Sequence, residues 1–391
     1  MLKQIFDNDR LAKSLSSSDV WQWNILSSYT DVDAAVEHTV QSWKENNLSL
    51  SALKTEIVNN KKVFLPNKME DAFAIKLLDL FIRRIYKVRQ SDRNRIVRQL
   101  KTLLKDSGEY HVLRLDVKDC YETISFKKLI NKFENQFILA PECLKLLNSI
   151  HNDLSSNHDM QGLPRGLSIS STLAELYLEN LDKDIASHPD VIYSARYVDD
   201  LIILVASGQE IEVKTEIEKL MRDIDLDLNP DKYYCGSAKS AEFELLGYSI
   251  KVQEIMRKPN KVILKISQPK VNKLKTRIMT SFCDYKKDRN IILLKRRLEY
   301  LSMLKKVKKG ENGNLLAGIA HNYQYVTDDF NCLKSIDGFF CQQLVNPRFG
   351  LNPQEQSLVK KISFFGNTIN RKVGKFSKKQ TVQIMRIWKN A

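Results

Sequence analysis

The pattern of apolar and polar residues predicts a chain of mixed helices and strands. Residues 71–88 (DAFAIKLLDLFIRRIYKV) repeat apolar side chains at helical spacing, and the basic segment 89–105 comes after them. Residues 111–117 (HVLRLDV) alternate apolar and polar positions, as a half-buried strand does. Residues 191–206 (VIYSARYVDDLIILVA) are apolar on both sides of a polar break at Asp199 and Asp200, which predicts a β-hairpin with its turn at these two acids.

The segments around these strands predict an α+β unit. Residues 161–168 (QGLPRGLS) form a Gly/Pro loop, and the residues from Ser170 onward open a helix with hydroxyls positioned to cap it. Residues 212–232 predict a helix with a charged face that ends in a proline-containing turn. Residues 243–252 (FELLGYSIKV) predict a further strand.

The two ends of the chain are predicted to be helical. Residues 1–70 are mixed in composition and predict short helices packed on the rest of the chain, with no chemistry of their own. From about Pro259 onward the chain is rich in lysine and has a mostly helical pattern, which is clearest at residues 273–282 and 293–309.

Composition agrees with a large folded enzyme that binds a polyanion. The 391 residues are 43% hydrophobic, and 62 Lys and Arg outnumber 47 Asp and Glu to give a net charge of +15, which suits RNA or DNA. The alternative from charge alone is an ordinary soluble basic protein. Six cysteines without a CxxC pair or zinc spacing indicate a reduced, cytoplasmic chain with buried thiols. The first residues lack a signal-peptide core and no apolar stretch approaches about 20 residues, so we expect neither secretion nor membrane insertion.

Three carboxylates are the candidate catalytic groups. Asp116 ends one predicted strand, and Asp199 and Asp200 lie in the turn of the predicted hairpin. The three would meet if these strands are neighbours in one sheet. Phosphoryl transfer by two divalent ions about 3.5 to 4 Å apart needs few acids, because Mg²⁺ takes only one or two carboxylates beside substrate phosphates. Taken singly, each acid is also explained as a surface carboxylate or a turn cap.

Five motifs resemble those of reverse transcriptases and occur in that family's order. RYVDDLIIL (196–204) resembles the YxDD signature, and LRLDVKDCYETIS (113–125) resembles the first aspartate motif. QGLPRGLSISSTLAELYL (161–178) resembles the family's GxPQGxxxSPxLAxxYL loop and helix. DLDLNPDK (225–232) looks like the motif that ends in a lysine, and ELLGYSI (244–250) looks like the LGY primer-grip strand.

The resemblance implies an α+β right-hand polymerase with fingers, a palm whose antiparallel sheet carries the catalytic acids, and a helical thumb. We expect an N-terminal helical extension over residues 1–70, fingers and palm over residues 71–255, and thumb and C-terminal region over residues 256–391. The resemblance implies two Mg²⁺ ions, with Mn²⁺ as an alternative, held by four residues. These implied metal ligands are Asp116, the backbone carbonyl of Val117, Asp199 and, less directly, Asp200.

The resemblance also assigns roles around the nucleotide. Lys232 matches the proposed proton donor to the departing pyrophosphate. Tyr121 lies where an aromatic ring excludes a ribose 2′-hydroxyl, although it is also explained as a core tyrosine. Arg89 or Arg93 binds the triphosphate, and the sequence does not separate the two.

The glycine-rich loop both fits and departs from the family pattern. Gly162 and Gly166 are expected to let the backbone approach nucleotide and template. Arg165 stands where the family usually has glutamine, and Glu175 stands where it usually has asparagine. We expect the charge of Arg165 to alter nucleotide or template preference.

The implied function is an RNA-directed DNA polymerase that copies a dedicated structured non-coding RNA in antiphage defence. Residues 314–325 and 333–344 look like those of compact bacterial defence reverse transcriptases, closest to the smaller subunit of the class 3, two-polymerase type. The implied partners are the RNA template, the DNA product, deoxynucleoside triphosphates, and a second polymerase subunit or another copy of the chain. Three alternatives stay open: a retron-type enzyme, a non-catalytic RNA-binding scaffold and an RNA-dependent RNA polymerase.

Overall fold

The structure is a computed structural model that describes residues 3–58, 60–310 and 313–388. The chain divides into two compact units. Unit 1 comprises residues 1–92 and 113–235, and unit 2 comprises residues 93–112 and 236–391. Each unit has a hydrophobic core of its own, so each is described by itself.

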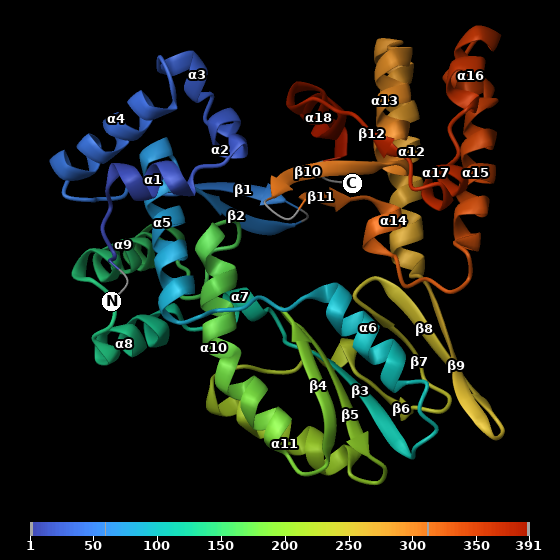
Figure 1. Ribbon diagram of the computed structural model, residues 1–391, viewed down its shortest axis with the longest axis horizontal. Coiled ribbons are helices and arrows are strands. Elements are labelled where there is room, and N and C mark those ends of the chain that lie inside the picture. The colour runs from blue at the N-terminus through green and yellow to red at the C-terminus, as the bar shows by residue number, and fades with distance from the viewer. Residues whose placement is uncertain (1–2, 59, 311–312, 389–391) are drawn as a thin grey trace. The chain divides into compact units, whose positions relative to one another are not determined.

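Unit 1 contains most of the helices that precede the predicted palm segments (Figure 1). Its helices are α1 (Asn8–Ser14), α2 (Ser17–Gln22), α3 (Ile25–Ser28), α4 (Val32–Glu45), α5 (Met69–Ile85), α7 (Cys120–Thr123), α8 (Phe126–Gln136), α9 (Pro141–His158), α10 (Ser168–Ser187), α11 (Glu210–Asp223) and the 3-10 turn η1 (Pro230–Lys232). Its strands are β1 (Lys54–Val58), β2 (Lys61–Leu65), β4 (Val191–Tyr197) and β5 (Asp200–Ala206), together with most of β3 (Tyr110–Asp116) and the first residues of β6 (Tyr234–Ser237).

A four-stranded sheet in the order β4-β5-β3-β6 carries the three candidate acids. β5 is an apolar run whose residues 201–205 are all buried, as expected of a strand inside a sheet. β4 pairs with β5 in antiparallel register with Tyr197 opposite Asp200, so Val198 and Asp199 form the turn. The predicted strand at residues 111–117 and the predicted hairpin are therefore confirmed, except that Asp200 begins β5 instead of lying in the turn.

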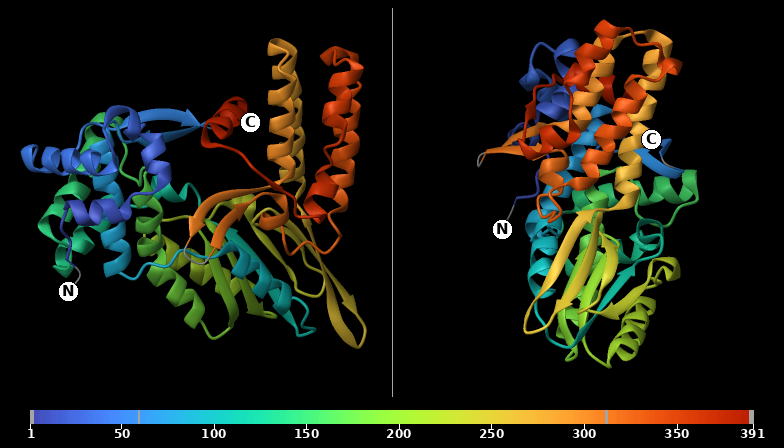
Figure 2. Two further views of the ribbon diagram at one scale, coloured as in Figure 1. Left: turned by 45° about the horizontal axis from the view of Figure 1, so that its top comes forward. Right: turned by 90° about the vertical axis from the view of Figure 1, so that its right-hand side faces the viewer.

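Two long helices pack together beside this sheet. α10 contacts both α5 and β4, and these elements lie side by side in Figures 1 and 2. α5 buries residues along its length because its apolar positions recur every three or four residues. The predicted helices at residues 71–88 and from Ser170 onward are confirmed.

Unit 2 contains the remaining helices and two small sheets. Its helices are α6 (Arg93–Leu103), α12 (Gln268–Asp288), α13 (Ile291–Ser302), α14 (Ile319–Asn322), α15 (Asn331–Leu344), α16 (Pro353–Lys360), α17 (Phe364–Ile369), α18 (Lys378–Met385) and the 3-10 turns η2 (Pro347–Phe349) and η3 (Arg386–Trp388). Its strands are β7 (Glu242–Leu245), β8 (Tyr248–Ile255), β9 (Lys258–Ile266), β10 (Leu304–Gly310), β11 (Gly313–Ala317) and β12 (Val373–Gly374).

Aromatic side chains hold the helices of unit 2 together. α13 and α15 both pack against α12, and the ring of Phe282 lies 5.2 Å from that of Phe349 and 6.2 Å from that of Phe340. β7, β8 and β9 form an antiparallel three-stranded sheet. Helices and antiparallel sheets together confirm the α+β class, while the domain boundaries expected at residues 70 and 255 stay predictions.

Four local predictions were wrong. Residues 1–70 are not helical throughout, because they include the β1–β2 hairpin. Residues 243–252 are two strands rather than one, since Leu246 and Gly247 both have positive φ and turn the chain between β7 and β8. Residues 293–309 are not one helix, because α13 ends at Ser302 and β10 comes next. The hydroxyl of Ser170 donates to the carbonyl of Pro164, at 2.5 Å, and does not cap α10.

The described part of the chain contains no helix with the length and apolarity that a bilayer span requires. All six cysteines are free thiols. Cys120 and Cys143 are buried as expected, but Cys235 and Cys341 are exposed, so the prediction of buried thiols was correct only in part.

Candidate active site

The ends of β3 and of the β4–β5 hairpin come together around two aspartates. Asp116 is the last residue of β3, and the backbone N–H of Val117 donates to the carbonyl of Asp199 at 2.9 Å. This bond joins the two motifs at the point where each carries its carboxylate. The hairpin reaches this position through Val198, a β-branched residue with φ of 59°, which is a strained backbone conformation.

Asp116 is held by a lysine and an asparagine from the loop after α11. Its side chain is nearly buried, and both carboxylate oxygens accept hydrogen bonds from Lys232 Nζ, at 3.0 and 2.9 Å. Asn229 Nδ2 lies 3.3 Å from the same carboxylate, and the Asn229 N–H donates to the Asp116 carbonyl at 2.7 Å. Val117 bridges Leu228 in the same loop. Hydrogen bonding to Asp116 raises the pKa of Lys232, so its ammonium remains protonated.

Asp199 and Asp200 complete a cluster of negative charge. Burial raises the pKa of Asp199 above its ordinary value, and the charges of Asp116 and Asp200 add to the rise. The carboxylate of Asp200 is paired with Arg114, whose Nη2 lies 3.0 Å away. The hairpin register and the Val117 hydrogen bond thus bring all three predicted acids to one end of the sheet.

The donor chemistry of this cluster fits a divalent cation. Carboxylate oxygens are hard ligands of the kind that Mg²⁺ prefers. Burial is the main cause of the raised pKa of Asp199, and a cation would relieve the added repulsion from Asp116 and Asp200. Within residues 3–58, 60–310 and 313–388, no three His, Cys, Asp or Glu side chains are arranged as a ready-made metal cage. Two carboxylates plus substrate phosphates are the usual arrangement for Mg²⁺, so a closed protein cage is not required.

A buried arginine supports the turn that carries Asp199. The side chain of Arg196 is only 2% exposed, and it donates to Asp182 at 2.8 and 2.7 Å, to Glu175 at 2.7 Å and to the Val198 carbonyl at 3.0 Å. Glu175, which departs from the family's usual asparagine, therefore serves as a counter-charge to Arg196. The sequence did not lead us to predict a role for Arg196, although a lone arginine inside the apolar segment 191–206 was a signal for one.

Comparison with known proteins identifies the domain that holds these residues. Residues 67–250 match the family described as reverse transcriptase (RNA-dependent DNA polymerase). The chain contains a reverse transcriptase domain. Asp116, Asp199 and Lys232 all fall inside the matched range, so the resemblance read from the motifs is confirmed for the domain.

Two solved telomerase structures are similar to this chain. Apo telomerase from Candida tropicalis, truncated from its C-terminal domain, is 13% identical over 51% of this chain and 53% of that chain, with a TM-score of 0.38. Telomerase from Candida albicans, in complex with the TWJ fragment of telomeric RNA, is 12% identical over 90% of this chain and 60% of that chain, with a TM-score of 0.40. The chain thus spans 53% and 60% of the lengths of these telomerase chains. No curated protein matches the chain.

Tyr121 of the reverse transcriptase domain lies under a charged pair. The guanidinium of Arg165 is 5.0 Å from the centre of the Tyr121 ring, and it donates to both carboxylate oxygens of Glu122, at 2.6 and 2.9 Å. This hydrogen bond raises the pKa of Arg165. The charge of Arg165 is therefore balanced by Glu122, and the pair rests on the face of Tyr121.

The β1–β2 hairpin places Lys61 beside the Arg165–Glu122 pair. Lys61 Nζ lies 3.2 Å from Asp119 and 3.7 Å from Glu122. Sequence reasoning placed no chemistry in this segment. The lysines of β1 and β2 could have indicated a basic surface here. The strands themselves were not predicted, because most of their residues are exposed and lack an alternating pattern.

The two glycines of the loop face the chain's own backbone. A Cβ at Gly162 would lie 2.2 Å from the Glu122 carbonyl oxygen, and a Cβ at Gly166 would lie 2.6 Å from the carbonyl oxygen of Phe64. Gly166 also has φ of +102°, a conformation that favours glycine. These glycines allow the loop to pack against α7 and β2, while their approach to nucleotide and template stays a prediction.

The two arginines that are candidates for binding the triphosphate differ in their contacts. Arg89, in unit 1, is exposed and forms no ion pair among the described residues. Arg93, in unit 2, donates to the backbone carbonyls of Leu246 and Asn322, and its guanidinium lies 5.1 Å from the ring centres of both Tyr248 and Tyr323. The guanidinium of Arg93 is therefore occupied within its own unit, whereas that of Arg89 is free to bind a ligand.

Proposed function

We propose that this chain is an RNA-directed DNA polymerase that uses two divalent cations. The observation that carries the proposal is the convergence of Asp116 and Asp199, which the Val117 hydrogen bond holds at one end of the sheet inside a reverse transcriptase domain. The raised pKa of Asp199 supports it, because burial and then the negative charges of Asp116 and Asp200 disfavour the bare carboxylate at the place where a cation would bind.

Asp116, Asp199 and the backbone carbonyl of Val117 would hold the metal ions, and Asp200 would assist. Two Mg²⁺ ions, or Mn²⁺ in their place, would stabilise the attacking primer oxygen and the leaving phosphate oxygen of an in-line displacement. Arg196 keeps the turn in place by its hydrogen bond to Val198. Lys232 carries a proton at Nζ beside Asp116, where it can be donated to the departing pyrophosphate.

The residues around Tyr121 would select the nucleotide. The flat Tyr121 ring leaves no space for a 2′-hydroxyl, so deoxynucleotides are favoured. The Arg165–Glu122 pair would shape the pocket beside this ring, with Lys61 next to Glu122, and Arg89 would bind the triphosphate. Gly166, together with Gly162, would line the template side of the same loop.

We also propose a place for this reaction in antiphage defence, in the cytoplasm of a bacterium. Support comes from residues 314–325 and 333–344, which look like those of compact defence-associated reverse transcriptases, and from the free thiols, which suit a reducing compartment. The template would be a structured non-coding RNA, and a second polymerase subunit or another copy of the chain would be its partner. A retron-type enzyme is the alternative lineage.

A primer-extension assay tests the polymerase. Purified chain, a primed RNA template and Mg²⁺ should incorporate deoxynucleotides and should incorporate ribonucleotides far more slowly. Incorporation of ribonucleotides at the same rate would identify an RNA polymerase instead. RNA binding without any incorporation, with either Mg²⁺ or Mn²⁺, would identify a non-catalytic scaffold.

A plaque assay tests the role in defence. Cells that express the chain with its neighbouring genes should resist phage, and the same cells with Asp199→Ala should lose that resistance. Equal plaque counts with the parent and the variant would exclude a role of polymerisation in defence.

A further inference from the structure

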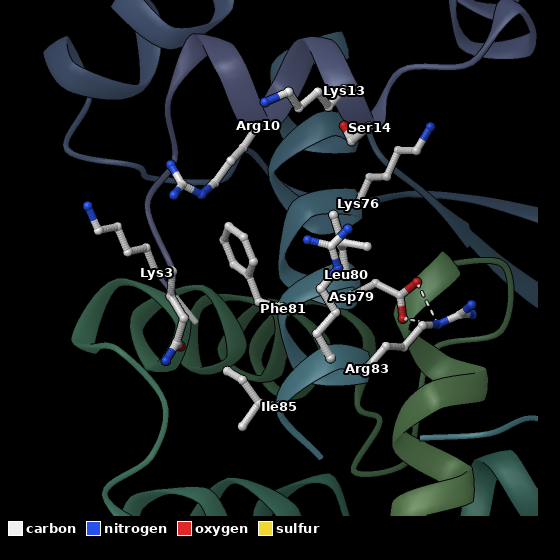
Figure 3. A pocket seen from close by; sticks show the side chains of 12 residues that line it. Lys3, Arg10, Lys13, Ser14, Lys76, Asp79, Leu80, Phe81, Arg83 and Ile85 are labelled. Atoms are coloured by element: carbon white, nitrogen blue, oxygen red, sulfur yellow. Dashed lines mark hydrogen bonds and ion pairs between the residues drawn. The ribbon is translucent and has the colours of Figure 1, made fainter. Parts of the chain in front are cut away.

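A pocket in unit 1 is lined mainly by positive charge. It encloses about 380 Å³ between the N-terminal segment, α1 and α5, which places it in the size range of ligand sites (Figure 3). Half of its twelve lining residues are basic: Lys3, Arg10, Lys13, Lys76, Arg83 and Arg84. None of these residues belongs to the catalytic cluster around Asp116.

Two helices each turn a basic face toward this pocket. On α1, Arg10 and Lys13 are three residues apart and lie on one side of the helix. On α5, Arg83 and Arg84 follow Lys76 by seven and eight residues, so these three also lie on one side of their helix. Seven residues of helix advance about 10 Å. The basic residues of α5 therefore extend over more than the length of a single phosphate group, although Lys76 and Arg83 are paired with Asp19 and Asp79.

The acid in the pocket is already neutralised. Asp79 is buried, and its carboxylate is paired with Arg83 and accepts a hydrogen bond from Thr172 of α10. Burial raises the pKa of Asp79. Its carboxylate therefore opposes an incoming anion less than a free acid would.

Two of the six cations have no internal partner. Among the described residues, Lys3 and Arg84 form no ion pair, and both are exposed. Arg10, Lys13 and Lys76 are paired with Asp7, Asp9 and Asp19. These pairings leave an excess of positive charge at the pocket, which an anionic ligand would balance.

An apolar floor lies beneath these charges. Leu80, Phe81 and Ile85 line the pocket, and Figure 3 shows Phe81 with Lys3 and Arg10 on one side and the Asp79–Arg83 pair on the other. Phe81 is only 5% exposed and packs on Phe6, so the accessible part of the floor is the aliphatic surface of Leu80 and Ile85. Aliphatic surface below a rim of cations matches a nucleic-acid strand, whose sugars are partly apolar and whose phosphates are charged.

We propose that this pocket binds a segment of single-stranded RNA outside the catalytic centre. The RNA contacts Lys3 and Arg84 through successive phosphates and covers the apolar floor with its sugars or bases. This site anchors the RNA while its templating part is copied elsewhere, so the inference deepens the proposed polymerase function and rests on it.

A double charge reversal tests the site. Lys3→Glu with Arg84→Glu should weaken binding of a fluorescent 20-nucleotide RNA, measured by anisotropy without nucleotides, by at least about tenfold near 0.1 M salt. The slope of log Kd against log salt should fall by about 1.4, since each lost contact with a single strand removes about 0.7. Lys127→Glu with Lys219→Glu is the matched control, because both lysines are exposed, unpaired and in unit 1 but outside the pocket.

If the pocket variant and the control variant weaken RNA binding equally, the proposal is overturned, because the change in net charge alone would then explain the loss of affinity. Competition by a free deoxynucleoside triphosphate at the same residues would also overturn it.

Cross-linking of 4-thiouridine RNA to the parent protein gives a result that does not depend on the variants folding. Cross-linked peptides should come from the N-terminal segment that carries Lys3, from α1 and from α5, and cross-links confined to other segments would contradict the site. Both readouts are independent of polymerisation, so failure here and failure of the polymerase proposal remain distinguishable.

Discussion

Lys232 and Asp116 form an ion pair in which one ammonium contacts both oxygens of the carboxylate, at 2.9 and 3.0 Å. The lysine thus occupies the oxygens that a metal ion would need. A cation held by Asp116 would compete with Lys232 for these oxygens, and Lys232 Nζ would remain close enough to serve as the proposed proton donor to the leaving phosphate.

Replacing Lys232 with alanine should separate these two effects. We expect kcat for deoxynucleotide incorporation to fall by about 10²-fold, the usual contribution of a general acid. The Mg²⁺ concentration for half-maximal activity should decrease, because no ammonium competes for Asp116. Lys219→Ala, on the exposed face of α11, is the control and should change neither quantity. An unchanged kcat in Lys232→Ala would remove the lysine from the chemistry.

Replacing Arg165 with glutamine should change nucleotide selection. Arg165 holds Glu122 and covers Tyr121, so its loss frees both the carboxylate and the ring. We expect the ratio of kcat/KM for deoxynucleotides over ribonucleotides to fall by about tenfold, and the relative use of the four bases to shift. Lys183→Gln, which breaks an exposed ion pair with Glu179, should leave the ratio as it is. Identical incorporation profiles for the parent and Arg165→Gln would contradict this role.

Alanine substitutions at Arg89 and Arg93 should affect different substrates. Arg89→Ala should raise KM for the deoxynucleotide by about tenfold, because a guanidinium that pairs with phosphate contributes about 1.5 to 3 kcal/mol. Arg93→Ala should loosen the turn at Leu246 and raise KM for the primed template, with KM for the nucleotide unchanged. Steady-state kinetics with each substrate varied in turn distinguish the two. The opposite pattern, with Arg93→Ala raising only the nucleotide KM, would place the triphosphate at Arg93.

Lys305 should make the stability of the chain depend on pH in the alkaline range. Burial lowers the pKa of Lys305 from 10.5 to about 8, with a further contribution from Arg277. Below about pH 8 both the folded and the unfolded chain carry this proton, and the full cost of burying the charge is present. Between about pH 8 and 10.5 the unfolded chain binds more protons, so the free energy of unfolding should rise with pH.

Lys305→Met is the variant that tests this dependence. It should stabilise the chain at pH 7 by at most about 3 kcal/mol, since one pKa unit corresponds to about 1.4 kcal/mol. The contact of Lys305 Nζ with the Tyr300 ring, 3.8 Å from its centre, favours the charged form and makes the gain smaller. Thermal unfolding from pH 7 to 10 measures both effects. Lys306→Met, at the neighbouring exposed position, should show neither.

The elements that carry the three candidate acids were predictable because their sequence pattern coincides with their burial. Residues 201–205 of β5 are apolar and buried, and the polar break before them falls at the turn, so Asp199 was placed correctly. The β1–β2 hairpin was missed because its strands are mostly exposed and carry lysines, which gives no alternation to detect. The role of Arg196 was missed because the arginine is held by Glu175 and Asp182, which lie on α10 and not on its own hairpin.

The break between β7 and β8 was missed for a different reason. Leu246 has φ of 49°, a conformation that its side chain gives no reason to expect, and only Gly247 marked the turn. Likewise, the change from α13 to β10 occurs within a lysine-rich segment whose composition suits a helix. Tertiary packing rather than local preference decides these boundaries.

The rate of deoxynucleotide incorporation by Asp199→Asn tests the catalytic role of the carboxylates most directly. Asparagine keeps the size of the side chain and removes its charge, and Asp223→Asn, on the exposed face of α11, serves as the control. We expect Asp199→Asn to lower the rate on a primed RNA template by at least about 10³-fold while RNA binding and thermal stability remain as in the parent. A rate within a few-fold of the parent would show that the carboxylates joined by the Val117 hydrogen bond do not carry the chemistry.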